Sequence, residues 1–157
     1  MRALLLALLT TGCTEFAWPG GDLALRPETT DRLAPIAGRW RSEVATAAAR
    51  WNLAAESAGC ADRFRLDDGP DAHPVRLYLR DEWPFDPDHL GETAGGPGGV
   101  IDVVDRWGTR SGDNLPTLLH ELGHALGLEH GPGVMAENVP TLTEPTADDV
   151  AALTAGC

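Results

Sequence analysis

The chain has 157 residues, of which 23% are charged, and its net charge at neutral pH is −12. This length is typical of one domain built around a single core. The strong negative charge argues against binding of nucleic acid, or of an anionic membrane surface, through charge alone. No nucleic-acid partner is therefore expected.

The first twelve residues have the pattern of a targeting segment. Arg2 supplies a positive charge, residues 3–9 are apolar, and Cys13 follows a glycine. The apolar run is far shorter than the roughly 20 residues that a membrane-spanning helix needs. The segment resembles a bacterial lipoprotein signal peptide, which implies cleavage after residue 12 and a lipid anchor on Cys13, facing the periplasm or the cell surface. An ordinary secretory signal is the alternative, and both interpretations export the chain.

Residues 13–31 contain prolines and glycines without clear periodicity, so we expect a lipidated N-terminus followed by a tether or extended arm. The domain itself is expected over residues 32–157. Its first element is predicted to be a long helix over residues 32–57, because apolar residues recur there at spacings of three and four: Trp40, Val44, Ala47, Ala48 and Trp51.

The cysteines fit an exported protein. If Cys13 carries lipid, Cys60 and Cys157 remain as an even pair in an oxidising compartment. A disulfide between them would close a loop of about 97 residues and restrict the unfolded chain. Two free thiols are the alternative. Neither cysteine has the Cys-x-x-Cys spacing that is typical of a metal site.

Further elements follow from local patterns. Residues 74–80 alternate between apolar and polar, which predicts a strand, and residues 100–104 predict another after a turn rich in glycine. Residues 146–153 predict a short C-terminal helix that begins with Thr146 as its cap.

Several candidate ligands lack a supporting pattern. His73 and His89 are isolated, and we expect both on the surface. Four aspartates could bind Ca²⁺, although no recognisable calcium loop contains them: Asp86, Asp88, Asp102 and Asp105.

The strongest chemical signal in the chain is the pattern H-E-x-x-H-x-x-G-x-x-H. On a helix, His120 and His124 project from one face and can hold Zn²⁺. Gly127 can adopt the left-handed conformation that ends a helix, and the chain can then turn back to bring in His130. Three protein ligands are typical of a catalytic zinc site, whereas structural sites usually have four. Glu121 can reach a water at such a site without being a ligand.

This motif resembles the signature of metzincin zinc peptidases, and the wider run over residues 118–130 resembles their matrixin branch. Metzincins also have a tight turn that places a methionine beneath the metal, the Met-turn, and Gly133-Val134-Met135 matches it. Only four residues separate His130 from Met135, which is fewer than in matrixins. Ala136-Glu137-Asn138 also replaces the proline and tyrosine that usually follow the methionine.

The resemblance implies an α+β fold of the zincin type. A small, twisted, mixed sheet would pack on a long first helix, with an active-site helix and a C-terminal helix. One catalytic zinc would be held by the three histidines, and Glu121 would act as general base. Residues 89–93 resemble the edge strand of matrixins, along which an extended substrate would lie against Leu90, Gly91, Glu92 and Thr93.

The sequence therefore predicts a monomeric zinc endopeptidase that hydrolyses a peptide or protein substrate with a zinc-activated water. Two alternatives remain open. The chain could be a zinc-binding lipoprotein whose peptidase chemistry has lapsed, and the short Met-turn loop is the main support for that interpretation. It could also hydrolyse peptides of the cell wall rather than proteins.

Overall fold

The structure, a computed structural model, describes residues 22–60, 63–67, 74–81, 90–94, 99–105, 114–137 and 141–156. Several predicted features lie outside these ranges: the signal peptide, Cys13, His73, Asp86, Asp88, His89 and Cys157.

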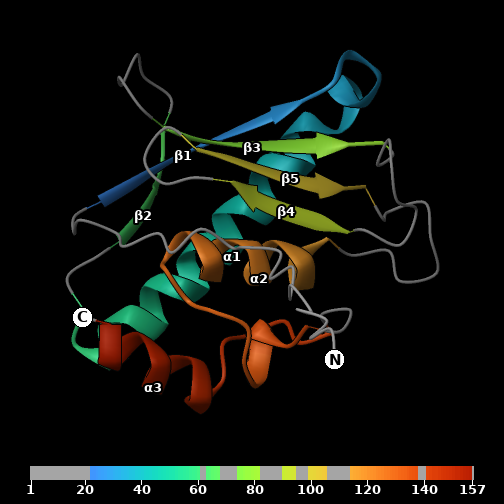
Figure 1. Cartoon of the computed structure of the whole chain (residues 1–157). Helices are drawn as coiled ribbons and strands as arrows, with labels where there is room; N and C mark the ends of the chain where they lie inside the picture. Colours follow the sequence, from blue (N-terminus) through green and yellow to red (C-terminus); the bar gives the residue numbers. More distant parts are fainter. Residues whose placement is uncertain are drawn as a thin grey trace, which may run out of the picture.

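A five-stranded mixed sheet forms one side of the molecule (Figure 1). Its strands lie in the order β2-β1-β3-β5-β4, and β4 at one edge is antiparallel to β5 whereas the other neighbours are parallel. The strands are β1 (Asp22–Thr29), β2 (Arg63–Leu66), β3 (Val75–Arg80), β4 (Gly91–Ala94) and β5 (Val100–Val104). The edge position predicted for the strand near Thr93 is thus confirmed.

One face of the sheet is apolar and the other is charged. Alternate residues of the central strands are buried: Leu23, Leu25, Val75, Leu77, Leu79, Ile101 and Val103. On the opposite face, Arg80 Nε donates to Asp102 Oδ1 at 2.5 Å. The helices must therefore cover the apolar face.

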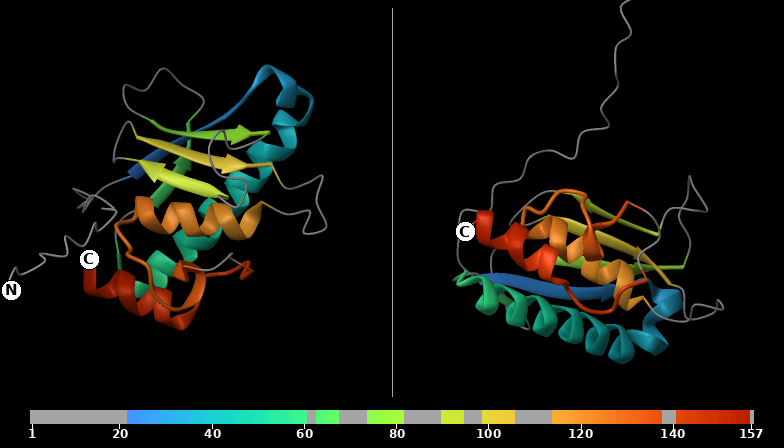
Figure 2. Two further views of the ribbon diagram at one scale, coloured as in Figure 1. Left: turned by 45° about the vertical axis from the view of Figure 1, so that its right-hand side comes forward. Right: turned by 90° about the horizontal axis from the view of Figure 1, so that it is seen from below.

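Within the described ranges, three α-helices and two short 3₁₀ helices accompany the sheet: η1 (Asp31–Ile36), α1 (Ala37–Ala58), α2 (Leu115–Ala125), η2 (Gly133–Met135) and α3 (Ala147–Gly156). Helix α2 lies beside β4, and α3 packs near the C-terminal end of α1 (Figures 1 and 2). Two tryptophans connect α1 to the sheet and to α2 through hydrogen bonds. The indole of Trp40 donates to Leu77 O at 3.1 Å, and that of Trp51 donates to Leu119 O at 2.8 Å. These side chains are fully buried, as predicted.

Two expectations about the N-terminal part are wrong. Residues 22–29 form strand β1 between β2 and β3 rather than a tether, because Leu23 and Leu25 alternate into the core. The predicted helix over 32–57 begins as a 3₁₀ turn that contains Pro35, whose missing N–H disfavours an α-helical turn there. Strand β2 was not predicted.

The predicted α+β class, with a mixed sheet packed on a long first helix, is confirmed. Among the described residues, no helix combines the length and the apolar character that crossing a membrane requires.

Candidate functional site

Helix α2 carries the motif because its sequence favours a helix with one strongly apolar face. Leu118, Leu119 and Leu122 are fully buried, and Pro116 lies in the first turn, where its missing N–H costs no hydrogen bond. The residue before the helix is Asn114, whose side chain makes no capping hydrogen bond. Packing against α1 and the sheet therefore holds this helix more than its cap does.

The helix ends as the glycine pattern predicts. Gly127 has a φ of 83°, in the left-handed region. Its N–H donates to His124 O at 2.9 Å, and Leu128 N–H donates to Gly123 O at 3.0 Å, which is the Schellman arrangement. The chain reverses at this point and carries His130 back over the helix.

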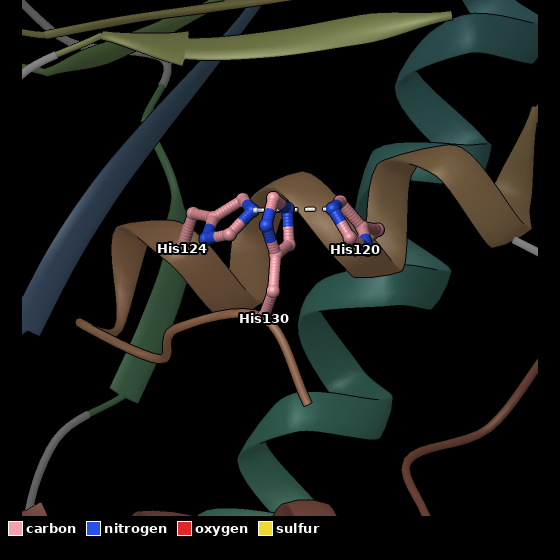
Figure 3. Close-up of side chains that lie close together, drawn as sticks. All are labelled: His120, His124 and His130. Carbon is pink, nitrogen blue, oxygen red and sulfur yellow. Dashed lines mark hydrogen bonds between the residues drawn. The ribbon is translucent and has the colours of Figure 1, made fainter. Parts of the chain in front are cut away.

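The three histidines of the motif face one another (Figure 3). The Nε2 atom of His124 lies 3.1 Å from that of His120 and 3.2 Å from that of His130. Two nitrogens bound tetrahedrally to one zinc at about 2.0–2.1 Å lie roughly 3.3 Å apart. Within the described part of the chain, this is the only group of three or more such side chains that could hold a metal ion.

Main-chain carbonyls fix the orientation of two of the rings. The Nδ1 atom of His120 lies 2.8 Å from Val134 O, and that of His124 lies 2.8 Å from Leu128 O. Because a carbonyl can only accept, both Nδ1 atoms carry the hydrogen and both Nε2 atoms present a lone pair. Lone pairs that converge at these distances repel one another unless a cation lies between them, so the donor set fits a metal such as zinc.

Burial keeps these rings neutral. It lowers the pKa of His120 to about 4, and it also lowers the pKa of His124. The third ring, His130, is more exposed, and its Nδ1 lies 4.0 Å from a carboxylate oxygen of Glu137. Metal ligation requires neutral imidazole, which the burial of His120 and His124 favours.

Glu121 lies on a different side of the helix, against strand β4. Its side chain is almost completely buried, and this burial raises its pKa from 4.5 to about 7. The hydroxyl of Thr93 donates to Glu121 Oε2 at 2.7 Å. Of the residues predicted to bind substrate, Gly91 and Thr93 face this carboxylate, whereas Glu92 is exposed.

Met135 packs directly beneath the helix. It is buried in η2, and a Cβ atom added to Gly123 would lie 2.3 Å from its sulfur. Gly123 lies between the first two histidines of the motif, so this close approach requires a glycine. The methionine of the predicted Met-turn thus packs against α2 between His120 and His124.

Asp149 of α3 supports the same turn and was not identified from the sequence. Its Oδ2 atom accepts from Val134 N–H at 3.2 Å, and from the N–H and hydroxyl of Thr146 at 2.7 Å each. Val134 in turn accepts from His120. The spacing Thr-x-x-Asp is typical of a helix cap and could have revealed the local half of this arrangement.

The calcium prediction gains no support from the described residues. Asp102 pairs with Arg80 on the charged face of the sheet, and neither Asp102 nor Asp105 belongs to a group that could hold a metal. Cys60 is buried, and its sulfur lies 3.8 Å from Leu153 O on α3. Its predicted partner lies outside the described residues, so the disulfide stays a prediction.

Comparison with known proteins finds a likeness in fold. The structure is similar to metalloproteinase-II from Bacteroides fragilis, with a TM-score of 0.57 and 14% sequence identity. The match covers 91% of this chain and 55% of that chain, so the present chain spans about half the length of the structure that it matches. No protein-family model matches the sequence, and no curated protein matches it. The chain thus has a mixed α+β fold similar to that of a metalloproteinase, with a histidine group that could bind a metal ion.

Proposed function

We propose that this protein is a zinc-dependent endopeptidase of the matrixin-like metzincin type. The observation that carries the proposal is the convergence of three imidazole Nε2 atoms. In two of these rings, Nδ1 is bonded to a main-chain carbonyl. Glu121, on the same helix as the first two histidines, lies against the edge strand β4. The fold likeness to a metalloproteinase supports the same conclusion.

The substrate is proposed to lie along strand β4. Within the described sheet, this strand is paired on one side only, by β5. An extended peptide can add to such an edge through main-chain hydrogen bonds, while its side chains enter pockets on alternate sides. Residues Leu90 to Thr93 would then fix the position of the scissile bond relative to α2.

The residues of the chain divide the chemistry between them. His120, His124 and His130 would hold the ion, which would supply a Lewis acid that lowers the pKa of a water and polarises the substrate carbonyl. Glu121 accepts a proton from the attacking water as its oxygen bonds to the carbonyl carbon. Glu121 then gives this proton to the amide nitrogen as the C–N bond breaks, which leaves a new carboxylic acid and a new amine. The proton of the acid then passes to the amine, which gives a carboxylate and an ammonium group.

The test is zinc stoichiometry combined with digestion of a proteome-derived peptide library. Wild type is expected to bind one zinc and cleave, whereas Glu121→Gln is expected to bind one zinc and lose activity by about 10²-fold or more. Glu129→Gln, an exposed neighbour in the motif, is the matched control and is expected to cleave like wild type. One zinc without cleavage by wild type would instead favour the zinc-binding alternative, and folded protein without zinc would overturn the proposal.

Export as a lipoprotein is part of the proposal and rests on the pattern of residues 1–13. Mass spectrometry of the membrane-associated protein is expected to find a lipid on Cys13 as the first residue. A soluble product that begins at another residue would favour the ordinary secretory signal.

A further inference from the structure

The carboxylate of Glu121 is held by the hydroxyl of Thr93. Thr93 Oγ1 lies 2.7 Å from Glu121 Oε2 and 3.0 Å from the main-chain oxygen of the same residue. Both partners are acceptors when the carboxylate is ionised, so the one hydroxyl hydrogen is donated to Glu121, and the shorter contact is with the carboxylate. The contact joins β4 to α2 across residues that are 28 apart in the sequence.

Gly91 provides the space for the other carboxylate oxygen. It lies two residues before Thr93, and alternate residues of a strand share a face. A Cβ atom at position 91 would lie 2.7 Å from Glu121 Oε1, and 2.9 Å from both Glu121 Cγ and Thr117 Cγ2. These distances are too short for a methyl group. Because Glu121 is only 4% exposed, its carboxylate has little other space to occupy.

We propose that Thr93 is a positioning residue that fixes the carboxylate of Glu121 in its working orientation, with Gly91 as the position that must stay without a side chain. This inference rests on the proposed function, in which Glu121 is the general base. It gives β4 a second role beside substrate binding. The strand that holds the peptide also holds the base, so the scissile bond and the carboxylate are placed by the same backbone.

The experiment compares Thr93→Val with Thr93→Ser. Valine keeps the shape of the side chain and removes the hydroxyl, and it is expected to lower kcat by about 10-fold to 100-fold, as expected for a lost hydrogen bond to a charged group. KM is expected to change by less than about twofold and zinc content not at all, because no ligand is altered. Serine keeps the hydroxyl and is expected to restore kcat to within about threefold of wild type.

Thr46→Val is the matched control. The Thr46 hydroxyl also donates to a main-chain oxygen, that of Ser42 at 2.9 Å, but on the distant helix α1. This variant is expected to have the kcat of wild type. Gly91→Ala provides a second test that keeps Thr93 intact, and it is expected to lower kcat with one zinc still bound, because the new methyl group displaces the carboxylate.

The outcomes separate the two claims. If wild type binds zinc but cleaves no peptide, the proposed function fails and this inference fails with it. If wild type cleaves and Thr93→Val keeps its kcat, this inference alone is overturned. A rise in KM at constant kcat would also overturn it, since Thr93 would then act on substrate, and so would a serine variant as slow as valine. Should Thr93→Val not fold, full kcat in folded Gly91→Ala overturns the inference.

Discussion

The three proposed metal ligands differ in how firmly the fold holds them. His120 is buried and His124 is half-buried, and each ring is bonded to a main-chain carbonyl, whereas His130 follows a reversing loop and is exposed. The Nε2 atoms of all three rings nevertheless converge on one point. The affinity of the site should therefore depend on the number of these rings.

Removal of the third ring tests this dependence. His130→Ala is expected to keep the fold, because the side chain is exposed, and to weaken zinc binding by at least about 100-fold, since even changes outside the ligand set cost 10-fold to 100-fold. Competition with a chromophoric chelator measures the affinity. Glu129→Ala, the exposed neighbour, is expected to bind zinc like wild type, and equal affinity in the two variants would contradict the assignment of His130 as a ligand.

The buried Glu121 predicts a pH dependence of stability in the zinc-free protein. Its pKa is raised to about 7 in the folded state from 4.5 in the unfolded chain. The folded state therefore holds this proton more tightly, so the stabilisation is complete below pH 4.5 and is lost as the pH rises through about 7. Glu121→Gln does not titrate and should avoid this loss.

Thermal unfolding of zinc-free wild type and Glu121→Gln measures the effect. The variant is expected to gain stability relative to wild type between pH 5 and pH 8. His120 acts in the opposite direction, because its lowered pKa reduces stability as the pH falls from 6.5 toward 4, but it is present in both proteins and cancels in the comparison. A difference in Tm that is the same at both pH values would contradict a buried, titrating carboxyl at this position.

Among the secondary-structure elements, the C-terminal end of α2 matters most for the proposed metal site, because the turn at Gly127 determines where His130 lies. Gly127 and Gly59 end α2 and α1 with nearly the same φ, 83° and 78°. Replacement of either by alanine is expected to cost about 1–2 kcal/mol of folding stability, because a side chain is strained in the left-handed region. Only Gly127→Ala should also weaken zinc binding, by about tenfold, because His130 follows that turn.

Gly59→Ala is the internal control for strain, since a Cβ atom there would meet nothing within 4 Å. Denaturant unfolding gives the two stability losses, and chelator competition gives the two zinc affinities. Equal zinc affinity in both variants would mean that the turn at Gly127 does not position His130.

The elements also show what the sequence can and cannot reveal. The histidines and Gly127 were predicted because the spacing along a helix and the glycine at its end are local properties. Strand β1 was not predicted, because only Leu23 and Leu25 show the apolar alternation of a strand and Pro27 follows them. So short an alternation, next to a proline, did not indicate a strand. The contact of Thr93 with Glu121, like that of Asp149 with the Met-turn, joins segments that are distant in sequence, and no local pattern encodes it.

At the scale of the whole molecule, the charge is distributed unevenly. Residues 1–80 contain ten arginines and ten acidic residues, whereas residues 81–157 contain two arginines and fourteen acidic residues. The entire net charge of −12 thus belongs to the part of the chain that contains β4, α2 and the Met-turn. Exposed acids there include Glu92 on the edge strand and Glu137 beside His130.

Peptides that carry positive charge are therefore expected to be the better substrates. In a matched pair that differs only in arginine or glutamate at positions flanking the cleaved bond, the arginine peptide should have the higher kcat/KM. The preference should shrink as the salt concentration rises, because exposed charges are screened. Equal rates at low salt would contradict this expectation.

The predicted disulfide between Cys60 and Cys157 would affect the stability of the whole fold. Cys60 already lies against α3, which ends one residue before Cys157. A bond between them is expected to add about 4.7 kcal/mol, because it closes a loop of about 97 residues in the unfolded chain. Thermal unfolding of wild type and Cys157→Ser, with and without reductant, measures the contribution. If reductant changes neither Tm nor the number of reactive thiols, the bond is absent.

The position of strand β1 limits how far the folded domain could lie from a lipid on Cys13. Because the sheet begins at Asp22, only residues 14–21 separate the proposed lipid on Cys13 from the folded domain. Eight residues span at most about 28 Å even when fully extended, which is less than the roughly 30 Å thickness of a membrane's hydrocarbon core. A lipid on Cys13 would therefore hold the folded domain close to the membrane surface. An anchored copy would cleave only chains that come to the membrane surface.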